Sequence, residues 1–380
     1  MTQNIHCPMI HGGLQIVLQN NSPFIYTQQC CLRQDSYSNT DGSDIWNDPR
    51  LVPLRDLNNK NIWSDGCWSC QGNELSGLTS FRTGMLEKFG ERKNLTGPQM
   101  LDLMFDISCN LACRTCDPGS STYWQHHLKE NNIPFIAKSP ISKANEMIQV
   151  LKNLDLSNLE MVVFCGGETL MGNAYWQVAE AIADMCPHSK EKITVKFQTN
   201  GTQPINEKYF DIIERFHLVK LNISLDGIQD RFEYLRWPAN WNQVVDNMFK
   251  LRSTLPVNVM FYIEQTISIF NLYYLDELQA WMQRNFHSNR LGPNKQGEYG
   301  NSVGYGNHLA WGLYEISNIT EEYASAIRKT KYANLITKNW QENSSKITSM
   351  INEIKKFDAI RNQDWRKTFP EVAYFYSRYI

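Results

Sequence analysis

The sequence contains no long hydrophobic run and no strong excess of charge of one sign. Its 380 residues carry a formal net charge of −2, without a lysine-rich tail or an arginine stripe, so we expect neither nucleic acid nor a membrane among its partners. The first residues have neither the basic segment nor the apolar segment of a signal peptide. We therefore expect a cytoplasmic protein.

Cysteine, in contrast, is abundant, and the ten cysteines are clustered, which favours metal or redox chemistry over disulfides in such a chain. Cys109, Cys113 and Cys116 follow the apolar run 100–105, which we predict to be a buried strand. Three thiolates on a loop after a strand can point at one site, as an iron–sulfur cluster requires. A tetrahedral zinc site would need a fourth nearby ligand, and the next Cys or His is His126.

A second group of cysteines lies in residues 1–97. Two alternating runs, 14–19 and 24–28, flank Asn-Asn-Ser-Pro at 20–23 and predict a β-hairpin. Cysteines precede this hairpin, follow it and form a later C-x2-C pair: Cys7, Cys30, Cys31, Cys67 and Cys70. Four of these thiolates can gather at one site, which would suit an iron–sulfur cluster or a small zinc knuckle.

From residue 98 to 290 the pattern alternates between short apolar strands and amphipathic helices. Repeated β–α units force parallel strands with right-handed crossovers, so we predict an α/β fold whose sheet of about six strands curls into a partial, TIM-like (β/α)6 barrel. We divide the chain into a Cys-rich module (1–97), a core (98–290), and a glycine-rich loop (291–306) followed by C-terminal helices to residue 380. We expect Cys165 and Cys186, which lie outside both cysteine groups, to pack in the interior.

Polar motifs follow the predicted strands of the core. The first is Gly166-Gly167-Glu168, whose glycines would let the backbone approach a ligand and whose carboxylate could bind an ammonium group. The next strands end at Thr199-Asn200 and at Ser224-Leu-Asp226. Each motif also has a plain structural explanation, because Asn-Gly and Gly-Gly form turns and Asp-Gly can cap a helix. Arg236 could likewise form only a surface salt bridge.

Taken together, these motifs resemble those of the radical S-adenosylmethionine (radical SAM) enzymes. The C-x3-C-x2-C spacing matches closely, except that Thr115 replaces the usual aromatic residue before the last cysteine. The resemblance implies that the three cysteines hold a [4Fe–4S] cluster whose open iron binds SAM. It also implies cofactor-binding roles for six residues, Gly166, Gly167, Glu168, Thr199, Asn200 and Ser224, and it makes Asp226 and Arg236 candidate catalytic residues.

The N-terminal module resembles the twitch and SPASM auxiliary-cluster modules, although those usually follow the core. Part of this resemblance is the stretch Glu74…Gly77…Ser80…Arg82. It implies a second [4Fe–4S] cluster held by Cys7, Cys30, Cys67 and Cys70. Adjacent residues in extended backbone point to opposite faces, so only one of Cys30 and Cys31 is expected to be a ligand. Cys30 has the offset from the hairpin that the related modules show.

The resemblance implies an enzyme that cleaves SAM reductively, with a reductant such as flavodoxin or ferredoxin, and that uses the 5′-deoxyadenosyl radical on a C–H bond. A second cluster would relay electrons. We expect a peptide or amino-acid-derived substrate, as in many twitch and SPASM relatives. Two alternatives stay open: a dehydrogenase or epimerase of a small polar molecule such as an aminocyclitol, sugar or nucleoside, and a non-catalytic iron–sulfur protein.

Overall fold

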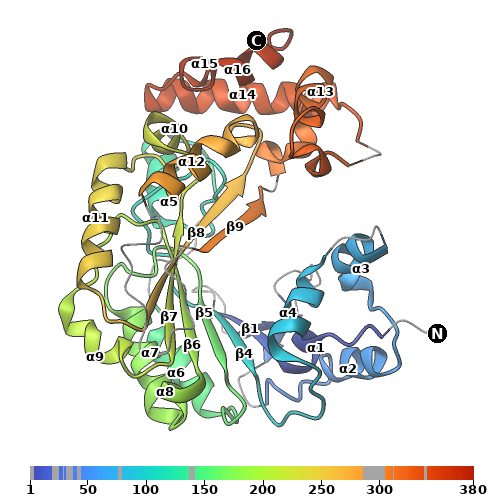
Figure 1. The fold of residues 1–380 in the computed structure, drawn as a ribbon, viewed down its shortest axis with the longest axis vertical. Coiled ribbons are helices and arrows are strands. Elements are labelled where there is room, and N and C mark those ends of the chain that lie inside the picture. The colour runs from blue at the N-terminus through green and yellow to red at the C-terminus, as the bar shows by residue number, and fades with distance from the viewer. Residues whose placement is uncertain are drawn as a thin grey trace. The chain divides into compact units, whose positions relative to one another are not determined.

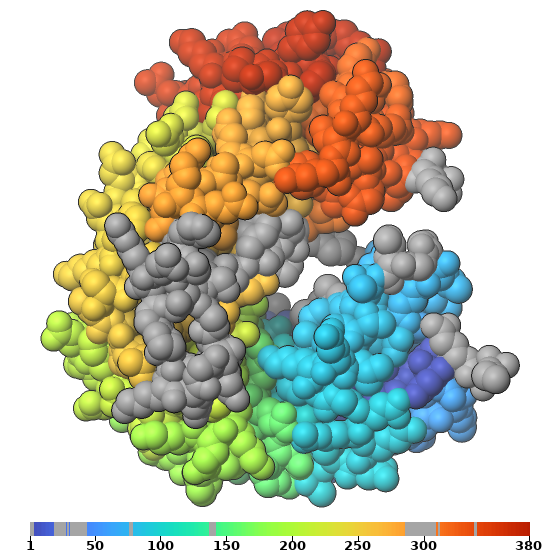
Figure 2. Space-filling model, viewed as in Figure 1, coloured from blue at the N-terminus to red at the C-terminus, as the bar shows by residue number. Residues whose placement is uncertain are grey.

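The computed structural model describes residues 4–18, 25–28, 30, 37–40, 44–75, 79–136, 142–285, 304–310, 312–337 and 340–380 (Figures 1 and 2). The chain forms two compact units, each assembled from separate segments of sequence. The first comprises Met1–Ser108, Lys138–Gln198 and Ile205–Lys220. The second comprises Cys109–Ala137, Thr199–Pro204 and Leu221–Ile380.

The first unit contains most of a β-sheet, with neighbouring strands in the order β3-β2-β1-β4-β5-β6, and the start of β7. Pairing is parallel from β1 through β4 and β5 to β6. The strands are β1 (Gly13–Leu18), β2 (Ile25–Gln28), β3 (Tyr37–Thr40), β4 (Met100–Met104), β5 (Met161–Phe164), β6 (Thr194–Thr199) and β7 (Leu218–Ser224). The helices are α1 (Pro8–Gly12), α2 (Val52–Asn59), α3 (Trp68–Leu75), α4 (Phe81–Phe89), α6 (Ala144–Lys152), α7 (Ala174–Met185), α8 (Ser189–Lys192) and α9 (Phe210–Ile213).

The second unit contains the end of β7 and two further strands, β8 (Val259–Ile267) and β9 (Gly304–Leu309), which pair in parallel. Strands β4 to β9 supply six parallel strands of an α/β fold, consistent with the predicted partial barrel, and β1 pairs in parallel beside β4. The helices of this unit are α5 (Thr122–Glu130), α10 (Gln229–Leu235), α11 (Trp241–Thr254), α12 (Leu275–Asn285), α13 (Glu321–Arg328), α14 (Ser344–Arg361), α15 (Trp365–Thr368) and α16 (Pro370–Phe375).

The predicted N-terminal hairpin is confirmed, because β1 and β2 pair antiparallel with Gln15 opposite Gln28. The turn predicted at 20–23 lies outside the described residues. Strand β1 also pairs in parallel with β4, with Gly13 opposite Met100. The hairpin therefore extends the sheet of the core, a pairing that joins two segments far apart in the sequence.

Each face of the first unit's sheet packs against a different helix. On one face, Phe164 contacts Tyr175 of α7, and Phe197 contacts Trp176 of the same helix. On the other face, Met161 and Val163 form an apolar cluster with Phe89 of α4.

The C-terminal helices share a core with the loops after β8 in the second unit. The helical stripe at 347, 350, 351 and 354 is buried on α14, as its spacing indicates. Of the glycine-rich segment 291–306, residues 291–303 lie outside the described residues and 304–306 begin β9. In the part of the chain that the structure describes, no helix is both long enough and apolar enough to span a membrane.

Candidate functional site

Backbone hydrogen bonds hold the loop of the second unit that carries Cys109, Cys113 and Cys116, which we call the three-cysteine loop. The N–H of Ala112 donates to the carbonyl of Trp237, and the N–H of Arg114 donates to the carbonyl of Leu235, both at 2.7 Å. Burial raises the pKa of the Cys113 thiol. A protonated thiol is a poor metal ligand, so binding a cluster here would release protons.

Two polar side chains lie against the sulfurs of this loop. The amide of Asn200 is 3.9 Å from the Sγ of Cys109, and the guanidinium of Arg236 is 3.9 Å from the Sγ of Cys113. Asn200 also donates to Asn110 Oδ1 at 3.0 Å, and Asn110 donates to Thr202 Oγ1 at 2.9 Å. Hydrogen-bond donors near cluster sulfurs adjust the reduction potential of an iron–sulfur site.

Arg236 and Asp226 form an ion pair, with 2.9 Å between Nη2 and Oδ2. The pair is buried, with Asp226 only 1% exposed, and is not the surface salt bridge that the sequence left open. Burial opposes the charge on Arg236, but Asp226 and then Cys113 outweigh it and raise the pKa of the guanidinium. Asp226 also accepts the N–H of Thr266 at 2.8 Å. The carboxylate therefore holds the arginine beside the cysteine sulfur.

In the first unit, Gly166 and Gly167 follow β5 and pass close to the backbone that follows β4. Gly166 has a φ of +131°, and a Cβ there would lie 2.4 Å from the carbonyl oxygen of Asp106. A Cβ at Gly167 would lie 2.2 Å from the carbonyl oxygen of Ser108. Glu168 donates its N–H to that same carbonyl at 2.7 Å, and its buried carboxylate accepts the N–H of Leu170 at 3.0 Å. Both glycines are therefore sterically required.

The remaining predicted cofactor residues lie at strand ends. Thr199 ends β6, is buried, and accepts the N–H of Gly201 at 3.1 Å. Ser224 ends β7 and is half-buried. The sequence predicts both positions at strand ends, and the structure bears this out.

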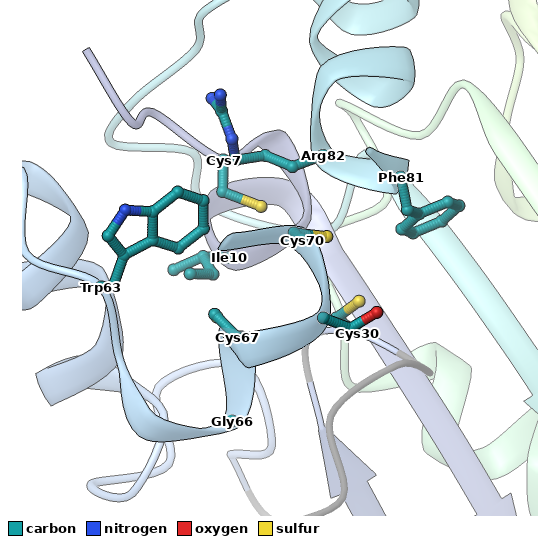
Figure 3. Close-up of a pocket in the computed structure, with 10 residues that line it drawn as sticks. Cys7, Ile10, Cys30, Trp63, Gly66, Cys67, Cys70, Phe81 and Arg82 are labelled. Atoms are coloured by element: carbon teal, nitrogen blue, oxygen red, sulfur yellow. The ribbon is translucent and has the colours of Figure 1, made fainter. Parts of the chain in front are cut away.

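The second cysteine group lines a pocket of the first unit (Figure 3). Cys7 precedes α1 and Cys30 follows β2, while Cys67 directly precedes α3 and Cys70 lies in the first turn of that helix. The remaining lining residues are Ile10, Trp63, Gly66, Ser69, Phe81 and Arg82. Cys31 lies outside the described residues. Burial raises the pKa of the Cys7 thiol to about 11.

The Glu74…Ser80…Arg82 stretch forms a polar brace beside this pocket. Arg82 pairs with Glu74 at 2.5 Å and donates to the carbonyl of His6 at 2.7 Å, while Ser80 donates to Glu74 at 2.6 Å. Glu74 raises the pKa of Arg82, and the cysteines at 7 and 70 add to the effect. Because Glu74 neutralises Arg82, this brace orders the backbone beside the pocket without adding a net charge to it.

Sequence reasoning missed the residue that positions Cys7. Asn58, buried on α2, accepts the N–H of Cys7 at 2.9 Å and donates to the carbonyl of Ile5 at 2.9 Å. The sequence of the asparagine-rich run 58–61 predicts a loop, and nothing in that run distinguishes Asn58 from the other asparagines. Its partners are about fifty residues away in the chain.

The thiols of both cysteine groups suit an iron–sulfur cluster, and the four thiols of the second group suit a zinc ion as well. Among the residues that the structure describes, no three His, Cys, Asp or Glu side chains come close enough together to hold one ion. A single zinc ion requires four ligands at about 2.0–2.3 Å. A [4Fe–4S] cluster instead takes each thiolate on a different iron and so tolerates a wider ring of cysteines. The three-cysteine loop and the four-cysteine pocket both have the required thiols.

Comparison with known proteins gives a match to one family model and matches to distant solved structures, two of which are described here. Residues 107–268 match the family model of the Radical SAM superfamily. Streptococcus suis SuiB bound to S-adenosylmethionine is 13% identical to this chain, with a TM-score of 0.39. The alignment covers 84% of this chain and 60% of the SuiB chain. Streptococcus suis SuiB bound to precursor peptide SuiA is 12% identical to this chain, with a TM-score of 0.39. That alignment covers 85% of this chain and 63% of the SuiB chain. No curated protein sequence matches.

The chain thus spans about 60% of the length of the SuiB chains named above. The family match begins just before the three-cysteine loop and ends just after β8. It therefore includes Gly166-Gly167-Glu168, Ser224 and the Asp226–Arg236 pair. By this match residues 107–268 of the chain are similar to the Radical SAM superfamily.

Proposed function

We propose that this enzyme modifies a C–H bond of a peptide or amino-acid-derived substrate, using one cluster at the three-cysteine loop and a second in the four-cysteine pocket. When bound, the first cluster and SAM supply a 5′-deoxyadenosyl radical that removes a hydrogen atom from the substrate. The electron would come from a reductant such as flavodoxin or ferredoxin. The chain's own residues supply binding, orientation and charge.

Each predicted residue has a defined task in this proposal. Cys109, Cys113 and Cys116 would hold the first cluster and leave one iron open for SAM. Glu168 would accept the SAM ammonium, and the backbone of the two glycines before it would approach the cofactor without Cβ interference. Thr199 and Ser224 would contribute hydroxyl groups at the strand ends.

The Asp226–Arg236 pair and Asn200 would act on the cysteine sulfurs. Arg236 lies 3.9 Å from the Sγ of Cys113, and a fixed positive charge there stabilises the more negative, reduced form of a cluster. Asp226 orients this arginine through their 2.9 Å ion pair. The pair would thus tune electron transfer, with Asp226 as a positioning residue.

The proposal of a second cluster rests on one observation: four cysteines line the same pocket, namely Cys7, Cys30, Cys67 and Cys70. Four thiolates would leave no iron open, so this cluster would relay electrons and would not bind substrate. Electron relay suits oxidative outcomes such as dehydrogenation or cross-linking. A zinc knuckle is the competing occupant of the same four thiols.

The test is anaerobic reconstitution followed by iron, zinc and sulfide analysis. We expect about eight irons per chain, since each cubane contains four. Replacing Cys109, Cys113 and Cys116 with Ala should halve the iron content and abolish release of 5′-deoxyadenosine from SAM under dithionite. Cys186→Ala, in a thiol buried away from both groups, is the control and should keep both. Four irons with one zinc would replace the second cluster by a zinc site, and no 5′-deoxyadenosine from a loaded, reduced sample would refute catalysis.

The substrate class needs a separate measurement. Short peptides encoded beside the gene can be incubated with the reconstituted enzyme, SAM and reductant and then analysed by mass spectrometry. A peptide that loses two hydrogens or gains a cross-link would support the proposal. If 5′-deoxyadenosine forms while every such peptide stays unchanged, the small polar substrate becomes the better assignment.

A further inference from the structure

A buried arginine at the end of α14 has two nitrogen atoms without a partner among the described residues. Arg361 is the last residue of this helix and is only 6% exposed. Its Nε donates to Nε2 of His127 on α5 at 3.2 Å. Its Nη1 and Nη2 are buried, and no residue that the structure describes accepts a hydrogen bond from either. A buried guanidinium is normally paired with an anion, so this side chain points to a negative group that the described residues do not supply.

The side chains that contact Arg361 are aromatic. Its guanidinium carbon lies over three rings, at 4.7 Å from the centroid of Trp124, 4.8 Å from Trp237 and 5.2 Å from Phe357. Burial, and then Arg361, lower the pKa of His127 to about 4, so the imidazole accepts its hydrogen bond as a neutral ring. The C-terminal end of a helix also favours a positive charge. Ring faces and a helix end offset only part of what it costs to bury a charge.

Two buried carboxylates of the second unit are already paired with other arginines. Asp358, three residues before Arg361 on α14, pairs with Arg114 at 2.5 Å. Asp226 pairs with Arg236 at 2.9 Å. Burial, and then Arg114, lower the pKa of Arg361 to about 9. These three arginines and two carboxylates leave one positive charge in excess, and it lies on Arg361.

Each ring over the arginine also contacts the three-cysteine loop. The indole N–H of Trp124 donates to the carbonyl of Cys113 at 2.9 Å. The carbonyl of Trp237 accepts the N–H of Ala112 at 2.7 Å, and Phe357 packs in one apolar cluster with Ala112. The guanidinium is therefore separated from this loop by a single layer of aromatic side chains.

A cluster on three thiolates suits this excess charge. Such a cluster is negatively charged, and one-electron reduction adds a further negative charge. Buried aromatic side chains between two charges screen them far less than water does, because the local dielectric constant is low. The unpartnered guanidinium therefore fits a negative group at the three-cysteine loop.

We propose that Arg361 supplies a fixed positive charge that stabilises the reduced form of the cluster held by the three-cysteine loop. This assignment rests on the proposed function and adds a residue from α14 to it. Arg236 lies closer to a sulfur, but its charge is shared with Asp226 in an ion pair. Arg361 has no such carboxylate among the described residues, so the net positive charge beside the loop comes from Arg361. His127 positions it through Nε.

The experiment measures the midpoint potential of this cluster by electron paramagnetic resonance during a redox titration of the full, reconstituted protein. The signal is assigned by its absence when Cys109, Cys113 and Cys116 are replaced with Ala. Arg361→Met should lower the ratio of reduced to oxidised cluster about tenfold at a fixed potential, which equals about 59 mV for a one-electron couple. Arg361→Lys keeps the charge and should restore most of the midpoint. Lys355→Met removes a charge from the exposed side of the same helix and should leave the midpoint unchanged.

An unchanged midpoint in Arg361→Met, or an equal shift in Lys355→Met, would overturn the proposal. Melting temperatures give a second readout. Cluster loading stabilises the folded state, and this rise should be smaller in Arg361→Met than in the wild-type protein. Because each variant is compared with its own cluster-free form, a purely structural effect of the substitution cancels, and an unchanged rise would also overturn the proposal. If the methionine variant does not fold, Arg361→Gln, which keeps an amide donor without the charge, is measured in the same way.

Failure of this inference and failure of the proposed function give different results. A three-cysteine loop that binds no cluster would refute both. A loaded protein whose midpoint is unchanged in Arg361→Met would refute only the role of Arg361. A shifted midpoint without release of 5′-deoxyadenosine from SAM would refute catalysis and leave the role of Arg361 standing.

Discussion

Arg114, between the second and third cysteines of the cluster loop, forms a buried ion pair with Asp358 of α14, with 2.5 Å between Nη2 and Oδ1. The same carboxylate accepts the hydroxyl of Tyr234 at 2.7 Å and the N–H of Trp365 at 2.8 Å. The guanidinium also stacks on the Tyr234 ring, 4.3 Å from its centroid. Within the second unit, α14 therefore anchors the loop that carries the three cysteines.

Asp358→Asn should destabilise the second unit by about 3 kcal/mol, because it leaves the buried Arg114 charge without its counter-ion. Urea unfolding followed by circular dichroism measures the effect. We also expect faster loss of the first cluster on storage. Glu321→Gln, which removes an exposed ion pair with Arg328, is the control and should cost about 1 kcal/mol or less. Equal effects of the two substitutions would show that the buried pair does not anchor the loop.

Gly167→Ala should destabilise the first unit and weaken SAM binding, because its Cβ would lie 2.2 Å from the carbonyl oxygen of Ser108. Gly84→Ala provides the matched control. Gly84 lies inside α4 with no atom within 4 Å of an added Cβ, so alanine there should stabilise the protein by about 0.5–1 kcal/mol. Opposite shifts of the unfolding midpoint are expected for the two variants. A neutral Gly167→Ala variant would mean that the close approach is not required.

The strands and the motifs at their ends could be predicted because their signals are local. Apolar runs of four to eight residues indicate β4 and β5, and the three clustered cysteines lie on a single loop, so their spacing alone predicts a common site. Parallel pairing then brings the ends of successive strands to one edge of the sheet. The long-range partners carry no such signal. Arg114 and Asp358 are 244 residues apart, and neither stands out from its neighbours in the sequence.

Arg236 shows the same limit in another form. Its sequence context left a surface salt bridge open, and only the structure shows that the pair with Asp226 is buried.

Glu168→Gln should weaken SAM binding by about tenfold or more while both clusters remain, because the ammonium would lose a charged acceptor. Glutamine keeps the carbonyl oxygen that can accept the N–H of Leu170, so the local turn should persist. Equilibrium binding of SAM to the reconstituted protein is the measurement. Glu191→Gln, at an exposed position on α8, is the control and should leave affinity unchanged. Unchanged affinity in Glu168→Gln as well would assign the motif to a turn only.

The ligands of the second cluster can be separated at the adjacent cysteines. Cys30 lines the four-cysteine pocket, and neighbouring residues in extended backbone point to opposite sides, so Cys30→Ser should remove the second cluster. Cys31→Ser is the matched control, one residue away with the same change in chemistry, and should retain about eight irons per chain. Iron analysis and electron paramagnetic resonance after reduction distinguish the variants. Loss of the second cluster in Cys31→Ser alone would assign the ligand role to Cys31. Intact clusters in both variants would mean that three thiolates hold the second cluster and that one of its irons is open. The second cluster could then bind substrate and would not act only as an electron relay.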